Sequence, residues 1–416
     1  MLVETFAFAA LGVAIGVFAG VMPGMHINTL VPLLLSLSAF AGSPLNAATL
    51  IVSVSITEMF LNQIPAIFVG APDADTVMSV LPGHRLLSEG RGYEAVKLTV
   101  IGGLGSLMVS LVFIALGAGA FSLLYELSRP YIHFVIAAVV VFMIVSEKEP
   151  RKMASAALVL FLSGALGILV LNSSVLRQQD TLLPVFSGLF GLSGMIVSFN
   201  ESSSAPPQSE KDVEHLGITK ADIAKSILFA SFAGILVGFL PAVGVSEAAV
   251  LTQYLGGPST ARGFLVTTAG INIANDAFSL MSLYLVGNPR SGASVAVQKI
   301  IGELTLFDVV FLVGVMLSVA GLAAWMTLRL GRTIPKLLAR VDYKTLTSAV
   351  MLFIMSVVFA ITGANGMLVL FASTSIGLLC NKLGVRRSHC MGVLLVQTML
   401  FFAGLNPIII SILNIQ

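Results

Sequence analysis

The stretch Gly20-Val-Met-Pro-Gly-Met-His-Ile-Asn-Thr29 interrupts an apolar run of the sequence. One proline, two glycines and three polar side chains do not suit a lipid-facing helix, because proline removes a backbone hydrogen bond. Broken backbone at membrane depth is tolerated only where protein or a water-filled cavity covers the freed peptide groups. The stretch therefore predicts a break in a membrane helix and, at that break, a binding site.

The composition predicts a protein embedded in the lipid bilayer. Of the 416 residues, 57% are apolar and 10% are charged, and the mean hydropathy is +1.00. The apolar stretches are mostly about 17 to 25 residues long, as membrane-spanning helices require, and lack the alternation of an outer-membrane barrel. We therefore expect an all-α polytopic membrane protein with roughly 12–14 membrane segments. With a net charge of +2, no nucleic acid is expected as a partner.

The apolar segments form two series separated by a hydrophilic stretch. The first series lies at 5–22, 29–41, 46–69, 95–120, 130–146, 153–172 and 180–198, and the second at 223–241, 245–257, 263–287, 305–328, 345–362, 366–380 and 390–414. The domains expected are a first repeat 1–199 (broken-helix core 1–92, scaffold helices 93–199), a cytoplasmic linker 200–222, and a second repeat 223–416 (core 223–303, scaffold 304–416).

Two motifs of the first half recur in the second half. Gly20-Val-Met-Pro23 corresponds to Gly238-Phe-Leu-Pro241, and Gly70-Ala-Pro72 corresponds to Gly287-Asn-Pro289. The prolines lie 49 residues apart in the first half and 48 in the second. The matched spacing indicates a duplicated unit.

Basic loops predict the orientation of the two repeats. Loops 329–344 and 381–389 are rich in lysine and arginine, which places them in the cytoplasm. Counting back puts the linker in the cytoplasm and both termini outside, in the plasma membrane of a prokaryote. Each half then has an odd number of crossings, so the repeats are inverted, as in alternating-access transporters. The segments around each break are either full helix pairs or re-entrant hairpins; the shortness of 29–41 and 245–257 favours half-helices or hairpins with tips near mid-membrane.

The paired breaks predict an anion site. The short helices after Pro23 and Pro241 begin with exposed N–H groups, which bind carboxylate or phosphate, although Gly-Pro elements also occur as simple kinks. The other positions expected to bind the substrate, as close backbone approaches, hydrogen-bond donors or closing loops, are Gly24, His26, Asn28, Thr29, Gly70, Pro72, Thr76, Gly244, Ser246, Gly287 and Ser291.

Three acidic residues lie inside apolar segments: Glu58, Glu247 and Asp276. Left ionised and unpaired at the bilayer centre, they would cost roughly 8–10 kcal/mol together. We therefore expect them to bind H⁺ or Na⁺ as a coupling ion, assisted by Asn62, Asn272 and Asn275; an internal hydrogen-bond network is the alternative. No other metal and no cofactor is expected.

Several of these motifs resemble a known family. Gly20-Val-Met-Pro-Gly24, Gly70-Ala-Pro-Asp-Ala-Asp-Thr76 and the second-half breaks are similar to the large permease subunit (TctA type) of tripartite tricarboxylate transporters. The resemblance implies secondary transport of citrate or other carboxylates, with a small membrane subunit and an extracytoplasmic binding protein as partners. It also implies a substrate site at Pro23, Gly24, Asn28, Thr29, Gly70, Pro72, Thr76, Pro241 and Ser246.

The function expected is ion-coupled secondary transport of di- or tricarboxylates by alternating access. The paired breaks are also similar to those of membrane proteins that return polyprenyl-phosphate carrier lipids, so a lipid-phosphate translocase is the alternative. An intramembrane lipid-modifying enzyme is a third reading. Hydrolase and nucleotide-binding motifs are absent from the sequence, so no enzyme is expected, and a homo-oligomer stays open.

Overall fold

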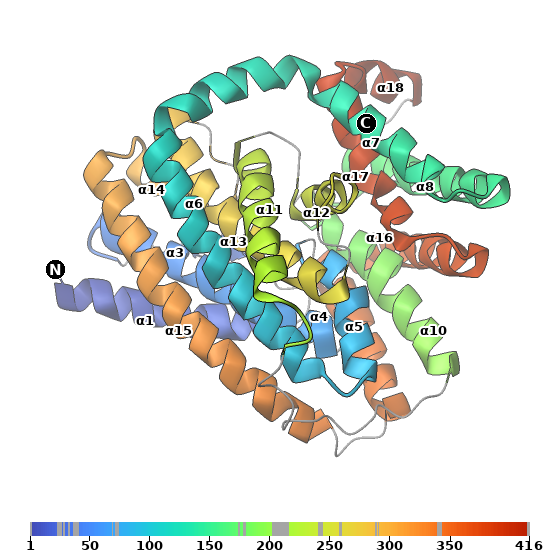
Figure 1. The fold of residues 1–416 in the computed structure, drawn as a ribbon, viewed down its shortest axis with the longest axis horizontal. Coiled ribbons are helices and arrows are strands. Elements are labelled where there is room, and N and C mark those ends of the chain that lie inside the picture. Colours follow the sequence, from blue (N-terminus) through green and yellow to red (C-terminus); the bar gives the residue numbers. More distant parts are fainter. Residues whose placement is uncertain are drawn as a thin grey trace. The chain divides into compact units, whose positions relative to one another are not determined.

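The fold comes from a computed structural model (Figure 1). The structure describes residues 2–413 except 23–26, 28–29, 32–33, 36–40, 69, 71–74, 174, 178–179, 202–215, 240–243, 258–259, 288, 290 and 339–342. Every element in this part of the chain is a helix.

The helices fall into two compact units, described separately below. Unit 1 holds α1 (Leu2–Val21), α3 (Pro44–Leu61), α4 (Gln63–Phe68), α5 (Val80–Ser88), α6 (Gly92–Ser128) as far as Leu123, α11 (Lys220–Phe239), α12 (Val245–Tyr254), α13 (Ala261–Val286), α14 (Gly292–Ile301) and α15 (Leu306–Leu338). Unit 2 holds the end of α6, η2 (Arg129–Tyr131), α7 (Ile132–Val145), α8 (Pro150–Leu171), α9 (Leu182–Phe186), η3 (Ser187–Leu192), α10 (Ser193–Glu201), α16 (Tyr343–Leu383), η4 (Arg387–Met391), α17 (Gly392–Phe402) and α18 (Asn406–Leu413). The short helix η1 (Val77–Ser79) lies at a boundary between them.

Each unit takes helices from both halves of the sequence. Unit 1 combines most of the described residues of both expected broken-helix cores with the expected scaffold helices α6 and α15, whereas Gly70–Val77 of the first core and the remaining scaffold helices belong to unit 2. The two units therefore do not coincide with the expected division into core and scaffold. That the two halves are repeats of one domain stays a prediction.

The all-α polytopic membrane class is confirmed. Among the described residues, seven helices are long and apolar enough to cross a membrane, or eight if a bent pair counts as one span. That pair, Arg387–Phe402 with Asn406–Ile412, bends by 111°. The span expected at 390–414 is therefore not one straight helix, because Gly404 (φ +70°) turns the chain before the Asn-Pro pair that starts α18.

Helices α1 and α3 lie parallel and in register. Contacts between them join residues about 41 positions apart all along their length. The pairs are Thr5 with Asn46, Gly12 with Ser53, Gly16 with Thr57 and Gly20 with Leu61. The glycines allow this close approach: a Cβ on Gly16 would lie 2.6 Å from Cβ of Thr57.

Helices α11 and α13 repeat this pairing. Thr267 donates to the carbonyl of Ser226, 41 residues earlier, and a Cβ on Gly238 would lie 2.4 Å from Cβ of Phe278. Two parallel helices that start at one level require a connection that returns to that level. In the second pair α12 lies between the two helices in sequence; it is about 15 Å long, half of the roughly 30 Å of α11.

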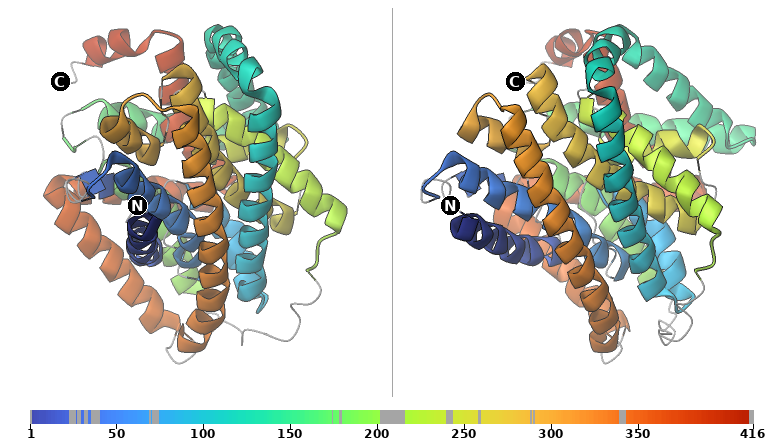
Figure 2. Two further views of the ribbon diagram at one scale, coloured as in Figure 1. Left: turned by 90° about the vertical axis from the view of Figure 1, so that its left-hand side faces the viewer. Right: turned by 60° about the vertical axis from the view of Figure 1, so that its left-hand side comes forward.

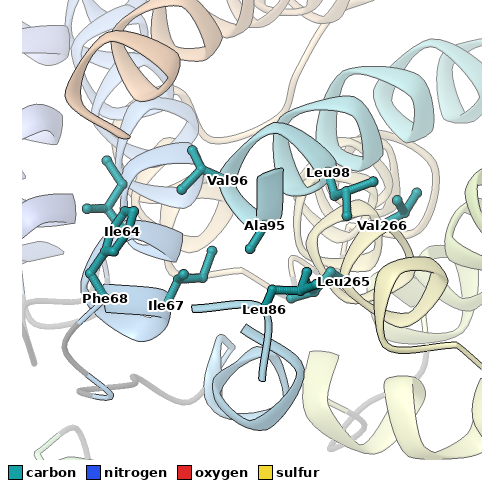
Figure 3. Close-up of a cluster of buried hydrophobic side chains, with 9 residues drawn as sticks. All are labelled: Ile64, Ile67, Phe68, Leu86, Ala95, Val96, Leu98, Leu265 and Val266. Carbon is teal, nitrogen blue, oxygen red and sulfur yellow. The ribbon is translucent and has the colours of Figure 1, made fainter. Parts of the chain in front are cut away.

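The two parallel pairs run in opposite directions within unit 1. A buried cluster joins Ile67 and Phe68, at the end of α4, to Leu265 and Val266, near the start of α13 (Figure 3). Because Ser55 meets Asp276 further along, α3–α4 and α13 are antiparallel. This agrees with the predicted inversion of the two halves, which itself stays a prediction.

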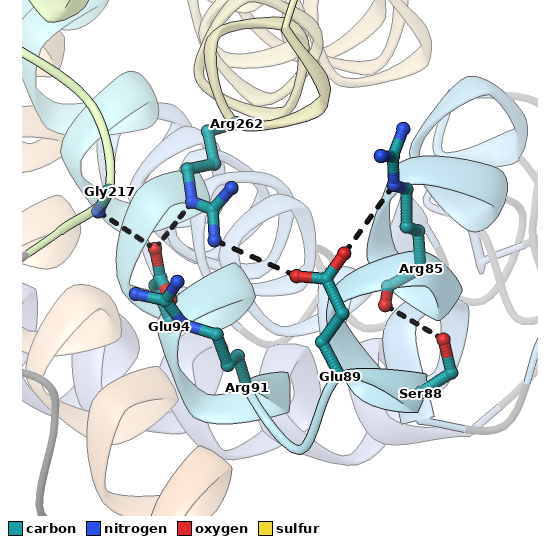
Figure 4. A network of polar contacts seen from close by, with 7 residues as sticks. All are labelled: Arg85, Ser88, Glu89, Arg91, Glu94, Gly217 and Arg262. Carbon is teal, nitrogen blue, oxygen red and sulfur yellow. Dashed lines mark hydrogen bonds and ion pairs between the residues drawn. The ribbon is translucent and has the colours of Figure 1, made fainter.

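An ion-pair network joins the ends of several helices in unit 1 (Figure 4). Buried Glu94, at the start of α6, pairs with Arg91 and accepts from Nε of Arg262 (2.8 Å) and from the backbone N–H of Gly217 (3.2 Å). Nearby, Gly331 of α15 packs on α6, and Figure 2 shows these two long helices side by side. The starts of α6, α11 and α13 and the end of α15 therefore lie on one side of unit 1.

Unit 2 interlocks the two halves through close contacts at glycine. Gly392 of α17 packs on the Leu160 carbonyl of α8, where a Cβ would lie 2.5 Å from that oxygen. In the same way, Gly188 of η3 packs on the Leu370 carbonyl of α16, also at 2.5 Å. Each half thus supplies one partner to each contact. α16 itself breaks at Gly363 (φ 65°), which agrees with the two spans expected at 345–362 and 366–380.

The Gly16→Ala substitution should destabilise the protein, because the new methyl group overlaps Thr57 and the carbonyl of Val54. We expect the free energy of unfolding to fall by about 1–3 kcal/mol. Thermal and denaturant unfolding of the purified protein in detergent measures this. Gly321→Ala in α15 is the matched control, because nothing lies within 4 Å of its Cβ; an equal loss in both variants would contradict the packing described.

Arg262→Ala should also destabilise the protein, because it removes a charge-assisted bond from a carboxylate that is 3% exposed. The expected loss is about 1.5–3 kcal/mol in the free energy of unfolding. The control is Arg85→Ala, whose pair with Glu89 joins side chains that are 73% and 41% exposed; that loss should stay below about 1 kcal/mol. Equal effects would refute a structural role for the network.

Glu147, just beyond α7, makes unit 2 sensitive to acid. Burial raises the pKa of Glu147, but its bonds with His389 (2.9 Å) and the backbone N–H of Arg386 (3.1 Å) lower it more, so the pKa lies below its ordinary value. The stabilisation is therefore complete above the ordinary value of about 4.3 and is lost as the pH falls through the lowered pKa.

Glu147→Gln should therefore lower stability at pH 7 and flatten the loss of stability below about pH 4.3. Melting temperatures measured between pH 7 and pH 3 check this. Glu149→Gln is the control, because that side chain is 65% exposed. If the melting temperature of Glu147→Gln fell with pH as steeply as that of the unsubstituted protein, Glu147 would not be the source of the acid sensitivity.

Candidate functional site

Helices α3 and α13 are polar helices in the buried centre of unit 1. Every residue from Asn46 to Leu61 and from Gly263 to Leu283 is buried. Their buried polar residues are Asn46, Thr49, Ser53, Ser55, Thr57 and Glu58 in α3 and Thr267, Thr268, Asn272, Asn275, Asp276, Ser279 and Ser282 in α13. Polar groups inside membrane helices are costly and mark functional sites by default.

One hydrogen bond joins the two helices at their polar faces. The Ser55 hydroxyl donates to Oδ2 of Asp276 at 3.0 Å. Residues three, four or seven positions apart share a helix face, so this contact fixes which residues face the partner helix. We define the polar seam as Ser55, Glu58 and Asn62 of the first half and Asn272, Asp276 and Ser279 of α13.

Glu58 lies at the centre of the first-half side of the seam. Its side chain is fully buried, and its Oε1 accepts from Nδ2 of Asn62 at 3.2 Å. Asn62 in turn accepts from Gln63 at 3.3 Å. A Cβ on Gly20 would lie 2.9 Å from the backbone carbonyl of Glu58. Helix α1 therefore ends at the level of Glu58.

Asn272 is the residue of the seam whose side chain makes the fewest hydrogen bonds within the described part of the chain. It is 0% exposed, and within the described part of the chain neither its Nδ2 nor its Oδ1 has a hydrogen-bond partner. Oδ1 of Asn275, one turn further along α13, is in the same state. Buried amides are almost always hydrogen-bonded, so these two side chains require a separate explanation.

The start of α12 carries its own carboxylate. Gly244 is the N-cap, and Ser246 and Glu247 lie buried in the first turn. A Cβ on residue 244 would lie 2.6 Å from Oε2 of Glu247, so the Glu247 carboxylate folds back over the helix N-terminus. The N-terminus of α12, which was predicted to bind an anion, therefore lies beside the carboxylate of Glu247.

The predicted closing loops lie at defined positions. Gly287 (φ 68°) ends α13, and Ser291 is the N-cap of α14. The backbone N–H of Ser291 donates to Oγ of Ser279 at 2.6 Å. Ser291 is thereby joined to the polar seam. Gly70 (φ 69°) and buried Thr76 belong to unit 2 and are not placed against unit 1.

Seven of the expected site positions lie outside the described residues: Pro23, Gly24, His26, Asn28, Thr29, Pro72 and Pro241. Their role stays a prediction. The structure also adds two residues that the sequence analysis missed, Ser55 and Ser279. Their only signal is spacing, since each lies three residues from a buried acid on the same helix face.

Comparison with known proteins decides the family. The profile of the "Tripartite tricarboxylate transporter TctA family" matches residues 6–392. The chain belongs to the TctA family. Uncharacterized protein MJ1079 of Methanocaldococcus jannaschii is similar to the chain, with 28% identity over 407 residues that cover 95% of this chain and 98% of that protein. No solved structure matches the chain.

Membership in the TctA family confirms the resemblance noted in the sequence. It makes the chain a multi-pass membrane transporter of the tripartite tricarboxylate type, a system that includes other subunits and a binding protein. The buried carboxylates therefore belong to a member of a transporter family.

Proposed function

We propose that this TctA chain carries small di- or tricarboxylates across the plasma membrane of a prokaryote by alternating access, coupled to Na⁺ or H⁺. The observation that carries the proposal is the polar seam inside unit 1, next to the end of α1. Two carboxylates buried in the central helices α3 and α13 serve ion coupling better than stability, because such groups are costly to bury.

The start of α12 supports a carboxylate substrate. A helix N-terminus attracts anions through its free N–H groups and its dipole, and here Glu247 occupies that position. While Glu247 is ionised, it repels a substrate carboxylate that approaches the same N–H groups. A bound H⁺ or Na⁺ would neutralise Glu247 and admit the substrate, which links anion binding to a cation.

Glu247→Gln should remove the dependence of carboxylate binding on pH. Glutamine keeps the size of the side chain and an oxygen at the helix end but cannot take up a proton. Binding of citrate, succinate and malate to the purified protein, followed by thermal shift and calorimetry between pH 5.5 and 8, measures this. We expect affinity to rise at least tenfold toward acid pH in the unsubstituted protein and to stay constant in the variant.

Glu303→Gln is the matched control, because Glu303 is exposed beyond the end of α14. It should bind carboxylates with the pH dependence of the unsubstituted protein. Uptake of labelled citrate into proteoliposomes, with the partner subunits present, tests transport itself. Stabilisation by polyprenyl phosphate with no response to any carboxylate would overturn the proposal in favour of a lipid-phosphate translocase.

A further inference from the structure

We propose that the polar seam is a Na⁺ site, with Asn272 and Asp276 of α13 and Glu58 of α3 as its central ligands. The inference rests on the proposed ion-coupled function and deepens it, because it selects the ion and locates it between α3 and α13. It assigns Glu247 to the substrate end and not to the Na⁺ site.

Asn272 gives the first reason to expect a ligand in the seam. Its amide is fully buried, and neither polar atom has a partner within the described chain. A buried polar atom without a hydrogen-bond partner destabilises the fold. Asn272 lies one turn before Asp276, on the face that meets Ser55, so a group bound there also reaches the carboxylate side of the seam.

The charge of the seam selects a cation over the anionic substrate. Glu58 and Asp276 are 0% and 2% exposed, and each accepts a hydrogen bond, from Asn62 and Ser55 respectively. The only basic residue in either helix is Arg262, which binds Glu94. A cation reduces the cost of two acids in one seam, whereas an anion would raise it.

The donor atoms favour Na⁺ over a proton. A proton forms one carboxylic O–H, which donates a single hydrogen bond and so reaches only one acceptor of the seam. Na⁺ is a hard cation, and hard cations take carboxylate, amide and carbonyl oxygens; the seam supplies two acids, two asparagine side chains and serine hydroxyls.

The position of the seam explains how a bound ion would affect the substrate. Glu58 lies at the end of α1, where the first break begins, and Ser279 holds the backbone N–H of Ser291 in the loop between α13 and α14. An ion that draws α3 and α13 together would therefore fix the elements that flank the substrate region. By linkage, Na⁺ and substrate each raise the affinity for the other.

The experiment measures Na⁺ binding with no carboxylate present. The melting temperature of the purified protein is recorded at pH 8 as NaCl replaces KCl or choline chloride at constant ionic strength, and binding of radioactive Na⁺ is measured directly. We expect a saturable rise with Na⁺ alone. Asn272→Ala and Asp276→Asn should each weaken Na⁺ binding at least tenfold. Ser55→Ala is a milder change that should weaken Na⁺ binding several-fold, and it provides the test if the other two variants fold poorly.

Asn172→Ala is the matched control, because Asn172 is a hydrogen-bonded asparagine of unit 2 that pairs with Gln397. It should keep the full Na⁺ response. An equal response to K⁺, or stabilisation by acid pH with none by Na⁺, would overturn the Na⁺ site. Carboxylate uptake driven by protons alone would refute the Na⁺ site and leave the proposed function standing. Na⁺ binding with no carboxylate binding would support the Na⁺ site and refute the proposed function.

Discussion

The close parallel packing of α1 on α3 and of α11 on α13 is the constraint on which unit 1 depends. Glycines bring the helices together with nearly the same residue offset in both pairs. Because the two helices of a pair start at the same level, the chain between them must return, and a return requires a break at the end of the first helix. The packing places the end of α1 beside Glu58 and the end of α11 beside Phe278.

The same packing keeps a polar seam in the centre of an apolar unit. The polar faces of α3 and α13 meet each other, and their other sides are covered by glycine-lined neighbours. The polar groups are thereby removed from lipid, where they would cost most. Polar side chains in the seam do not lower the energy of the fold as leucines would, which is why their presence favours a role in transport.

Hydropathy predicted most of the helices, because a membrane-spanning helix appears in the sequence as an uninterrupted run of apolar residues of a defined length. The bend at Gly404 escaped it, since the residues on both sides are as apolar as a continuous span. In the candidate site, Glu58 and Asp276 were expected from the cost of burying an acid, and Asn272 as a side chain that assists them. Ser55 was not, because a serine in a membrane helix commonly bonds its own backbone, and its contact with Asp276 joins residues 221 positions apart.

The exchange of partners between halves affects how the chain matures. In unit 1, α14 and α15 of the second half pack on α3, and α5 of the first half packs on α13. When the ribosome has completed only the first half, α3 is fully synthesised but lacks the helices that later cover its serines and its acid. The contact between Ser55 and Asp276 can therefore form only after α13 of the second half has been made. A gene split at the linker would need both products made together in one membrane.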